Sequence, residues 1–258
     1  MDKYIAKVIR PSVSTPEEEA RQVAIEAPVS IEFNGIGYAV MMATPSDLED
    51  FVTGFAISER LVERADQLAA INVHAHEKGW IIRANVASDK ADMVFERART
   101  RIAESSCGLC GLENLELVAR PLPKVSEHQP VSKEHVFAAL AALEDYQPLN
   151  KATGGVHAAA WVDQTGAIAC VREDVGRHNA LDKLIGAMAR QNRSLSTGFV
   201  LTTSRCSYEI VEKAVIAGAT TLVTISVPTS IAIERAASCG LTLISLARSD
   251  SYLDYSGN

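Results

Sequence analysis

The second half of the chain alternates short apolar runs with amphipathic helical patterns, and this alternation limits the possible folds more than any other feature. The apolar runs predict strands over residues 156–162, 167–172, 199–203, 222–226 and 241–247. Helices are expected between them, around residues 181–188, 207–218 and 229–239. Because strands this apolar need helices over their faces, the pattern indicates a layered α/β sheet.

The first half of the chain carries a different pattern. Asn34 and Gly35 join the apolar runs 29–33 and 38–42, and they predict a hairpin because both residue types tolerate the positive φ angles of a tight turn. A helix is expected next, with Thr44 as its cap and apolar residues at positions 48, 51, 52 and 55, and residues 80–86 are expected to form a strand. These elements predict a smaller α+β lobe.

The boundary between the two lobes is expected where charges crowd at residues 89–101 and where glycines and prolines follow at 105–130. The predicted organisation is an N-terminal α+β lobe over 1–104, a flexible loop and linker over 105–130, and a larger lobe over 131–258. Ser132 should cap the first helix of that lobe, and the polar residues 249–258 should form a loop or tail.

Composition excludes several classes of protein. The chain has 258 residues, of which 47% are hydrophobic and 22% charged, as in folded globular proteins. The formal net charge of −7 disfavours a nucleic-acid partner, since it lacks the broad attraction to phosphate backbones. The start of the chain does not resemble a signal peptide, and no apolar run has the ~20 residues that span a bilayer. A cytoplasmic protein with no membrane partner is expected.

The cysteine pair Cys107 and Cys110 is the strongest chemical signal in the sequence. Glycines beside the two cysteines let the backbone bend and leave both sulfurs reachable. A thiolate is a strong nucleophile once its pKa falls, and the second thiol can attack a sulfur carried on the first, which releases it or closes a disulfide. The spacing therefore suits sulfur relay or redox chemistry.

The same spacing also occurs as half of a zinc site, which needs two further ligands. The other cysteines form no second pair of this kind: Cys170, Cys206 and Cys239. A site completed by histidines stays open. The zinc deaminase pattern, H-x-E with P-C-x-x-C, is absent because neither His74 nor His157 has a glutamate two places on and because Ser106 precedes the first cysteine of the pair.

Polar residues gather where the predicted strands of the second lobe end. In α/β sheets, ligands settle at the carboxyl ends of strands, where helix N-termini offer unpaired N–H groups to anions. Capping explains most of the serines, threonines and acidic residues there. It does not explain four cationic or potentially cationic side chains near helix starts, which oppose the helix dipole unless an anion is bound: Arg177, His178, Lys183 and Arg205. A phosphate-bearing ligand fits this arrangement, whereas for His157 alone a hydrogen-bonded, half-buried histidine is an equal alternative.

Five motifs are together far more specific than the cysteine spacing. They are SCGLCG at 106–111, GGVHAA at 154–159, EDVGRHNALDK at 173–183, TSRCSYE at 203–209 and SVPTS at 226–230. With these motifs the chain resembles the formate dehydrogenase accessory sulfurtransferases, the FdhD family, along most of its length.

The resemblance implies a sulfurtransferase. In such a protein a cysteine desulfurase loads a persulfide on the first cysteine of the loop, here Cys107, and Cys110 assists or resolves it. The sulfur then passes to a bound substrate, the molybdenum or tungsten bis(molybdopterin guanine dinucleotide) cofactor, before that cofactor is inserted into formate dehydrogenase. The resemblance also implies a three-layer, cytidine deaminase-like fold for the C-terminal lobe, without deaminase activity, and a possible homodimer.

The resemblance further implies which residues bind the cofactor, and none that bind a metal. In the strand-end motifs they are Gly155, His157, Asp174, Arg177, His178, Asn179, Lys183, Ser204, Arg205, Ser226 and Thr229. The family's guanine nucleotide segment after the last strand corresponds to Leu246, Ala247, Arg248, Ser249, Asp250 and Ser251. Arg248 matches the family pattern, whereas its aromatic residue and second arginine are missing here.

Two other functions remain open on the sequence. One is a non-catalytic chaperone that binds the molybdenum cofactor while the cysteine pair holds zinc or only packs. The other is a thiol-disulfide oxidoreductase, although the sequence around the cysteine pair lacks the compact βαβ setting of thioredoxin-like proteins.

Overall fold

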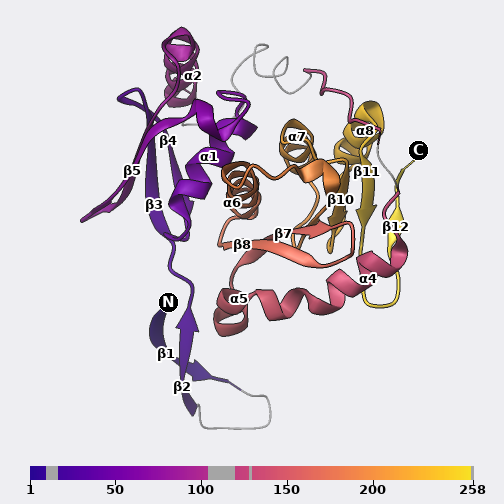
Figure 1. Ribbon diagram of the computed structural model, residues 1–258. Helices are drawn as coiled ribbons and strands as arrows, with labels where there is room; N and C mark the ends of the chain where they lie inside the picture. Colours follow the sequence, from indigo (N-terminus) through magenta and orange to yellow (C-terminus); the bar gives the residue numbers. More distant parts are fainter. Residues whose placement is uncertain (10–16, 104–119, 128–129, 257–258) are drawn as a thin grey trace.

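The computed structural model describes residues 1–9, 17–103, 120–127 and 130–256, and it arranges them as a mixed α/β protein with three sheets (Figure 1). The largest sheet has six strands in the order β12-β11-β10-β9-β7-β8. Its strands are β7 (His157–Asp163), β8 (Ile168–Asp174), β9 (Gly198–Thr202), β10 (Thr221–Thr224), β11 (Thr242–Ser245) and β12 (Leu253–Asp254). β9, β10 and β11 run parallel to one another, and β7 runs antiparallel to both of its neighbours.

Helices cover both faces of this sheet, so the C-terminal part has three layers (Figure 1). On one side lie α6 (Arg177–Arg190), α7 (Tyr208–Ile216) and α8 (Ser230–Cys239), and on the other lie α4 (Lys133–Ala142) and α5 (Pro148–Thr153). Side chains alternate between the two apolar clusters along β7: Ala159 and Trp161 join α6, α7 and α8, whereas Ala160 and Val162 join α4. The apolar runs of the sequence are therefore strands buried on both faces.

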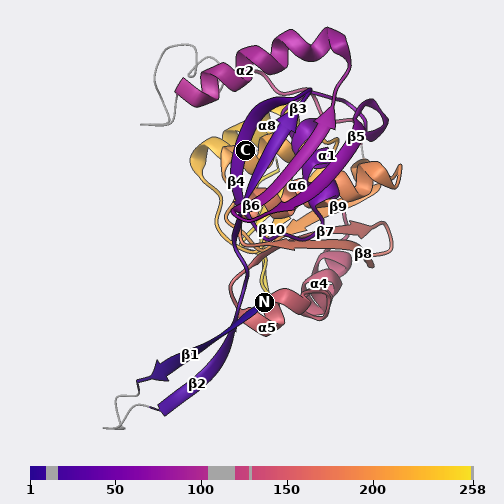
Figure 2. The ribbon, with the colours of Figure 1, turned by 90° about the vertical axis from the view of Figure 1, so that its left-hand side faces the viewer.

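The second sheet has four strands in the order β4-β3-β6-β5. They are β3 (Ala27–Phe33), β4 (Ile36–Ala43), β5 (Ala69–His76) and β6 (Gly79–Asn85), with α1 (Leu48–Ser58) inserted between β4 and β5. The predicted hairpin is confirmed, with Asn34 and Gly35 both at positive φ. Helix α2 (Ala91–Ala103) lies across this sheet (Figure 2). Short 3₁₀ turns are Ala65–Gln67, Ser88–Lys90, Leu143–Tyr146 and Leu195–Thr197.

Helices α1 and α6 join the two sheets into one apolar core. They cross at Gly54 and Gly186, where a Cβ on Gly54 would lie 1.7 Å from the carbonyl oxygen of Asp182. A Cβ on Gly186 would lie 1.8 Å from the carbonyl oxygen of Asp50. Only glycine permits so close an approach of the two backbones, and the crossing therefore fixes α6 against the N-terminal sheet.

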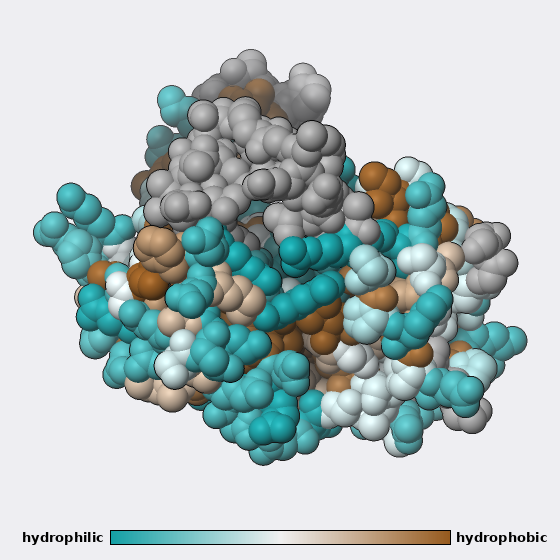
Figure 3. All heavy atoms as spheres, turned by 90° about the horizontal axis from the view of Figure 1, so that it is seen from above, coloured by the Kyte–Doolittle hydropathy of each residue, from teal (hydrophilic) through white to brown (hydrophobic). Residues whose placement is uncertain are grey.

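A two-stranded ribbon, β1 (Asp2–Val8) and β2 (Glu17–Val23), projects from the body of the molecule (Figures 1 and 2). Its side chains are exposed apart from the half-buried Val8, and they include Ile5 at 74% exposure. Elsewhere the view from above shows a largely hydrophilic face with separate apolar patches between the polar side chains (Figure 3). Among the described residues, every helix is too short or too polar to span a membrane.

The structure confirms most of the predicted elements and corrects some details. Ser132 caps α4 by accepting a hydrogen bond from the backbone of His135, as predicted. Thr44 does not cap α1, because Asp47 precedes that helix and Thr44 bonds instead to the β8–α6 turn. Residues 249–258 are not only loop, since β12 pairs with β11. The elements β1, β2, β5 and α5 were not predicted, and the charged stretch near residue 90 proves to be helix α2.

Candidate anion-binding site

One edge of the six-stranded sheet, here called the carboxyl edge, collects the strand-end motifs of the sequence. It comprises His157 and the segments 175–179, 203–207, 225–229 and 246–251. These segments meet because β8, β9, β10 and β11 end at this edge and β7 begins there, with His157 paired to Asp174 and Ala159 to Thr202. The predicted convergence of the junctions is therefore confirmed as geometry.

Backbone hydrogen bonds tie the junctions to one another. The amide of Cys206 donates to the carbonyl of Val227 at 3.0 Å, and the amide of Thr229 donates back to Cys206 at 3.0 Å. The amide of Leu246 donates to Ser226 at 3.2 Å, with Leu246 itself at a φ of 52°. The loops are consequently one connected surface rather than three independent turns.

The N-terminus of α6 presents the strongest cationic feature of this edge. Its cap residue is Gly176, which supplies no side chain, and the next two residues are Arg177 and His178. Among the described residues, the buried Nε of Arg177 has no hydrogen-bond partner. An uncapped helix N-terminus and a guanidinium N–H without an acceptor both favour an anion.

An acidic side chain from α7 lies beside this cationic pair. Nε2 of His178 is 3.1 Å from Oε2 of Glu209. This contact with His178, together with the positive charge of Arg177, lowers the pKa of the Glu209 carboxyl. The ionised form of Glu209 is therefore favoured beside His178. Sequence reasoning missed Glu209, although the 203–209 motif contains it.

His157, at the start of β7, faces the same group of charges. Its Nδ1 lies 3.4 Å from Oγ1 of Thr203, which also accepts a hydrogen bond from the amide of Ala158 at 3.0 Å. Burial lowers the pKa of His157, and the positive charge of Arg177 lowers it further, against the opposing effect of Asp174. The imidazole is thereby held in its neutral form near an accumulation of positive charge.

Three residues expected at the cofactor are instead buried and bonded to one another. Asp174 and Lys183 are 0% exposed, with Nζ 2.6 Å from Oδ2, and Asn179 donates to Oδ1 of Asp174 at 2.9 Å. The positive charge of Lys183 is therefore matched inside the protein and does not oppose the dipole at the start of α6. Of the four cationic residues singled out in the sequence, Arg177, His178 and Arg205 remain accessible.

The other predicted residues are spread over the carboxyl edge. Ser204 is buried and its hydroxyl lies 3.2 Å from that of Thr202, whereas Arg205 is exposed. Thr229 caps α8 by accepting from Ala232, and Ser226 is half-buried. The remaining predicted residues are Gly155, Arg248, Ser249, Asp250 and Ser251, all exposed, and the half-buried Leu246. Ala247, also predicted to bind the cofactor, is instead buried in the apolar core.

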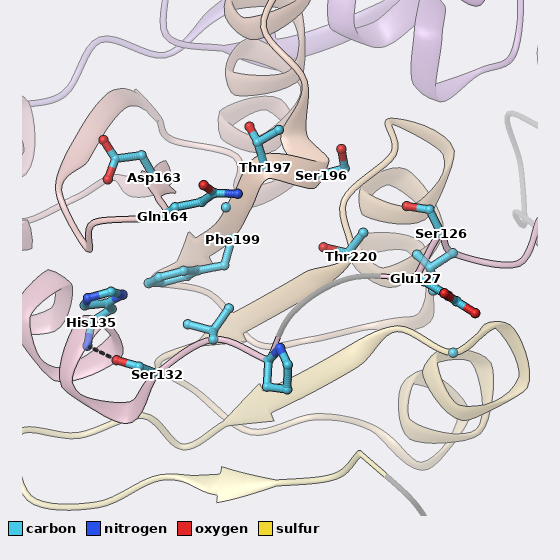
Figure 4. Close-up of a pocket in the computed structure, with 15 residues that line it drawn as sticks. Ser126, Glu127, Ser132, His135, Asp163, Gln164, Ser196, Thr197, Phe199 and Thr220 are labelled. Atoms are coloured by element: carbon cyan, nitrogen blue, oxygen red, sulfur yellow. Dashed lines mark hydrogen bonds between the residues drawn. The ribbon is translucent and has the colours of Figure 1, made fainter.

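A large hollow lies at the opposite edge of the sheet and is here called the amino-edge pocket (Figure 4). It measures about 1060 Å³, and Asp163, Phe199 and Thr220 place it where β7 ends and β9 and β10 begin. Figure 4 shows Asp163, Gln164 and His135 on one side and Ser126 and Glu127 on the other. Sequence reasoning did not predict this pocket, because hydroxyl, amide and carboxyl groups there form no motif.

The described cysteines are poor nucleophiles. Cys170, Cys206 and Cys239 are all buried, and burial raises the pKa of each thiol, to about 12 for Cys206. Cys107 and Cys110 lie outside the described residues. Within the described ranges no three His, Cys, Asp or Glu side chains gather in a way that could hold a metal ion.

The described residues that follow the cysteine segment run along α8. Nη1 of Arg235 donates to the carbonyl of Arg120 at 2.9 Å, and the amide of Val125 donates to Cys239 at 2.9 Å. Along this path the chain passes from the middle of α8 to its C-terminal end.

Comparison with known proteins assigns a family to this fold. A model of the FdhD/NarQ family matches residues 24–258. The chain belongs to the FdhD/NarQ family. The ribbon of β1 and β2 lies before the matched range, whereas every segment of the carboxyl edge lies within it.

Curated relatives in the family agree over most of the chain. "Sulfur carrier protein FdhD" of Xanthomonas oryzae pv. oryzae (strain MAFF 311018) is 45% identical over 91% of this chain and 83% of the relative. The protein of the same name from Variovorax paradoxus (strain S110) is 44% identical over 90% of this chain and 84% of the relative. A crystal structure described as that of a formate dehydrogenase accessory protein from Desulfotalea psychrophila has a TM-score of 0.76 at 24% identity, covering 99% of this chain and 96% of that one. This likeness shows the fold.

Proposed function

We propose that this chain is a sulfur carrier that takes sulfur as a persulfide on Cys107 and delivers it to a bis(molybdopterin guanine dinucleotide) cofactor bound as substrate at the carboxyl edge. Its close relatives are named sulfur carrier proteins. The observation that carries the proposal is the burial of three of the five cysteines with raised thiol pKa values, which leaves the sulfur chemistry to Cys107 and Cys110.

The proposed chemistry needs both cysteines. The Cys107 thiolate attacks the outer sulfur of a persulfide on a cysteine desulfurase, which forms the Cys107 persulfide and returns the desulfurase thiolate. Cys110 then attacks the inner sulfur, so that a Cys107–Cys110 disulfide forms and the outer sulfur leaves as sulfide. The two electrons come from the two thiols, and an external thiol reductant must reopen the disulfide before the next cycle.

The described residues fit the phosphates of such a substrate. The unpartnered Nε of Arg177 at the N-terminus of α6 can donate to a phosphate oxygen, and Arg205 adds a second, exposed guanidinium. Ser226 and Arg248 supply a further hydroxyl and a further guanidinium group along the same edge. We also propose a cytidine deaminase-like fold for the C-terminal part. Its six-stranded sheet supports this, because the antiparallel hairpin β7–β8 lies beside the three parallel strands β9, β10 and β11.

The proposal places the protein in the cytoplasm, between a cysteine desulfurase and formate dehydrogenase, with homodimer formation as a further expectation. The test is to incubate the full chain with a cysteine desulfurase and cysteine and to map persulfides by mass spectrometry. The expected adduct sits on Cys107 and is lost in Cys107→Ala, while the matched variant Cys170→Ala keeps it. A persulfide that survives Cys107→Ala at undiminished yield overturns the assignment.

The alternative function is a non-catalytic chaperone for the molybdenum cofactor in which the cysteine pair binds zinc. Metal analysis of the purified protein distinguishes the two functions. Stoichiometric zinc that disappears in Cys107→Ala favours the chaperone, whereas a metal-free protein that forms the persulfide favours the carrier.

A further inference from the structure

The ion pair between Asp174 and Lys183 is enclosed by hydrogen bonds from two parts of the chain. Oδ2 of Asp174 accepts from Nζ of Lys183 at 2.6 Å and from the amide of Thr44 at 3.0 Å. Oδ1 accepts from the amide of Gly176 at 2.7 Å and from Nδ2 of Asn179 at 2.9 Å. Both oxygens of this fully buried carboxylate are thus used twice, which offsets the loss of its hydration.

The cationic partner is held in the same way. Nζ of Lys183 also donates to the carbonyl of Thr44 at 2.9 Å, and Nδ2 of Asn179 donates to the carbonyl of Met42 at 2.9 Å. Met42 and Thr44 lie at the end of β4, in the four-stranded sheet, whereas Asp174 ends β8 in the six-stranded sheet. The cluster therefore fastens the end of one sheet to the end of the other.

The turn between β8 and α6 is held in place by this cluster. The amide of Val175 donates to Oγ1 of Thr44 at 3.2 Å, and the amide of Gly176 donates to Asp174. A Cβ on Gly176 would lie 2.7 Å from Nδ2 of Asn179, so the turn packs directly on the cluster. The next two residues are Arg177 and His178, which begin the helix facing the carboxyl edge.

We propose that Asp174 is a positioning residue: with Lys183, Asn179 and Thr44 it fixes the β8–α6 turn so that Arg177 and the N-terminus of α6 face an anionic ligand. This inference rests on the proposed function and goes beyond it. Asp174 touches no ligand, because its side chain is fully buried. Its two oxygens hold amides of the turn and of β4, and its charge is matched by Lys183, so it does not repel an approaching phosphate.

A second buried ion pair on the same helix supplies a matched control. Asp182 is 1% exposed, accepts from Nζ of Lys213 at 2.8 Å and accepts from the hydroxyl of Ser58 at 2.7 Å. It shares the helix, burial and charge pairing of the Asp174 cluster but has no bond to the β8–α6 turn. A purely structural role predicts the same behaviour for both pairs.

The experiment measures binding of GDP to the full chain by isothermal titration calorimetry, at a temperature well below the melting transition of every variant. We expect Asp174→Asn to raise the Kd for GDP at least about 10-fold, since it removes charge-assisted hydrogen bonds that hold the turn. We expect Asp174→Asn and Asp182→Asn to lower the melting temperature by similar amounts, because each removes the charge of a buried ion pair. Asp182→Asn should nevertheless change the Kd for GDP less than about 2-fold.

A second variant, which changes no charged residue, tests the inference even if Asp174→Asn does not fold. Thr44→Val removes only the hydroxyl that accepts from Val175, and we expect it to raise the Kd for GDP about 3-fold or more. Its control is Thr53→Val, which removes a buried hydroxyl that donates to Glu49 within α1. Wild-type affinity in folded Asp174→Asn, or in Thr44→Val, overturns the positioning role. No GDP binding by the wild type overturns the proposed ligand site itself, and with it this inference.

Discussion

The two edges of the six-stranded sheet differ, since one has a large pocket and the other has the groups that bind anions. The amino-edge pocket holds about 1060 Å³, yet its polar lining is mainly hydroxyl and amide groups with one carboxylate on either side, Asp163 and Glu127. The carboxyl edge presents an uncapped helix N-terminus, an unpartnered Arg177 Nε and a second exposed arginine, Arg205. Ligand charge, rather than the size of a hollow, decides which edge suits a phosphate, because helix dipoles and guanidinium groups favour anions.

The largest expected effect concerns thiol reactivity at the carboxyl edge. Cys206 lies in a junction of that edge, and burial raises the pKa of its thiol from 9.0 to about 12. A rise of three pKa units lowers the thiolate fraction at pH 8 by roughly 1000-fold. Timed alkylation with iodoacetamide, read by mass spectrometry, should therefore leave Cys206 unmodified in the native protein and label it in urea. Rapid labelling of native Cys206 would contradict the account, because the carboxyl edge would then hold its own nucleophile.

The next effect concerns the helix that carries the carboxyl edge. Gly186→Ala places a methyl group 1.8 Å from the carbonyl oxygen of Asp50, so α6 must move away from α1. We expect urea denaturation to show a loss of about 1–3 kcal/mol in the free energy of unfolding, the usual range for overpacking. Gly37→Ala is the control, since a Cβ there meets nothing within 4 Å. Equal stability of the two variants would show that the α1–α6 crossing does not hold α6 in place.

A smaller effect compares the two edges directly. Arg177→Ala should weaken GDP binding about 10-fold, as expected for the loss of one charge-assisted hydrogen bond with phosphate. His135→Ala, at the amino-edge pocket, should leave the Kd for GDP unchanged. Calorimetric titration of both variants gives the answer. The opposite ranking would move the ligand to the amino edge.

The smallest effect is a pH dependence from His157. Burial and the charge of Arg177 lower its pKa in the folded protein below the ordinary value of 6.5. Protonation therefore favours the unfolded chain, and stability falls as the pH falls below 6.5 and through the folded-state pKa. The melting temperature of the wild type should drop between pH 7 and pH 5, and His157→Gln should drop less. An identical drop in both proteins would show that His157 does not share the positive field of the carboxyl edge.

The sequence predicted the fold best where local signals agreed with burial. Apolar runs bounded by Gly218 or Gly240 gave β10 and β11, and the Asn34-Gly35 turn gave the β3–β4 hairpin. The exposed strands β1 and β2 were not predicted, because strands without a buried face show no clear alternation of polar and apolar residues.

The sequence predicted which residues lie at the site but not which side chains contact one another there. Strand-end motifs placed Arg177, His178 and Arg205 at one edge, which follows from parallel strand order alone. Lys183 was expected to face the ligand, yet its Nζ lies against Asp174, a pairing that depends on Thr44 from the other sheet. Contacts between residues about 140 positions apart leave no periodic signal in a sequence, so the buried cluster could be found only in the structure.

The most direct test of the account is hydrogen exchange by mass spectrometry on the full chain with and without GDP. A ligand at the carboxyl edge should slow exchange in segments 175–180 and 203–207, where helix N-termini offer their amides to the phosphates. Exchange in segments 163–166 and 196–199, at the amino-edge pocket, should be unchanged. Protection confined to the amino-edge segments would contradict the central claim that this protein holds its anionic substrate at the carboxyl edge.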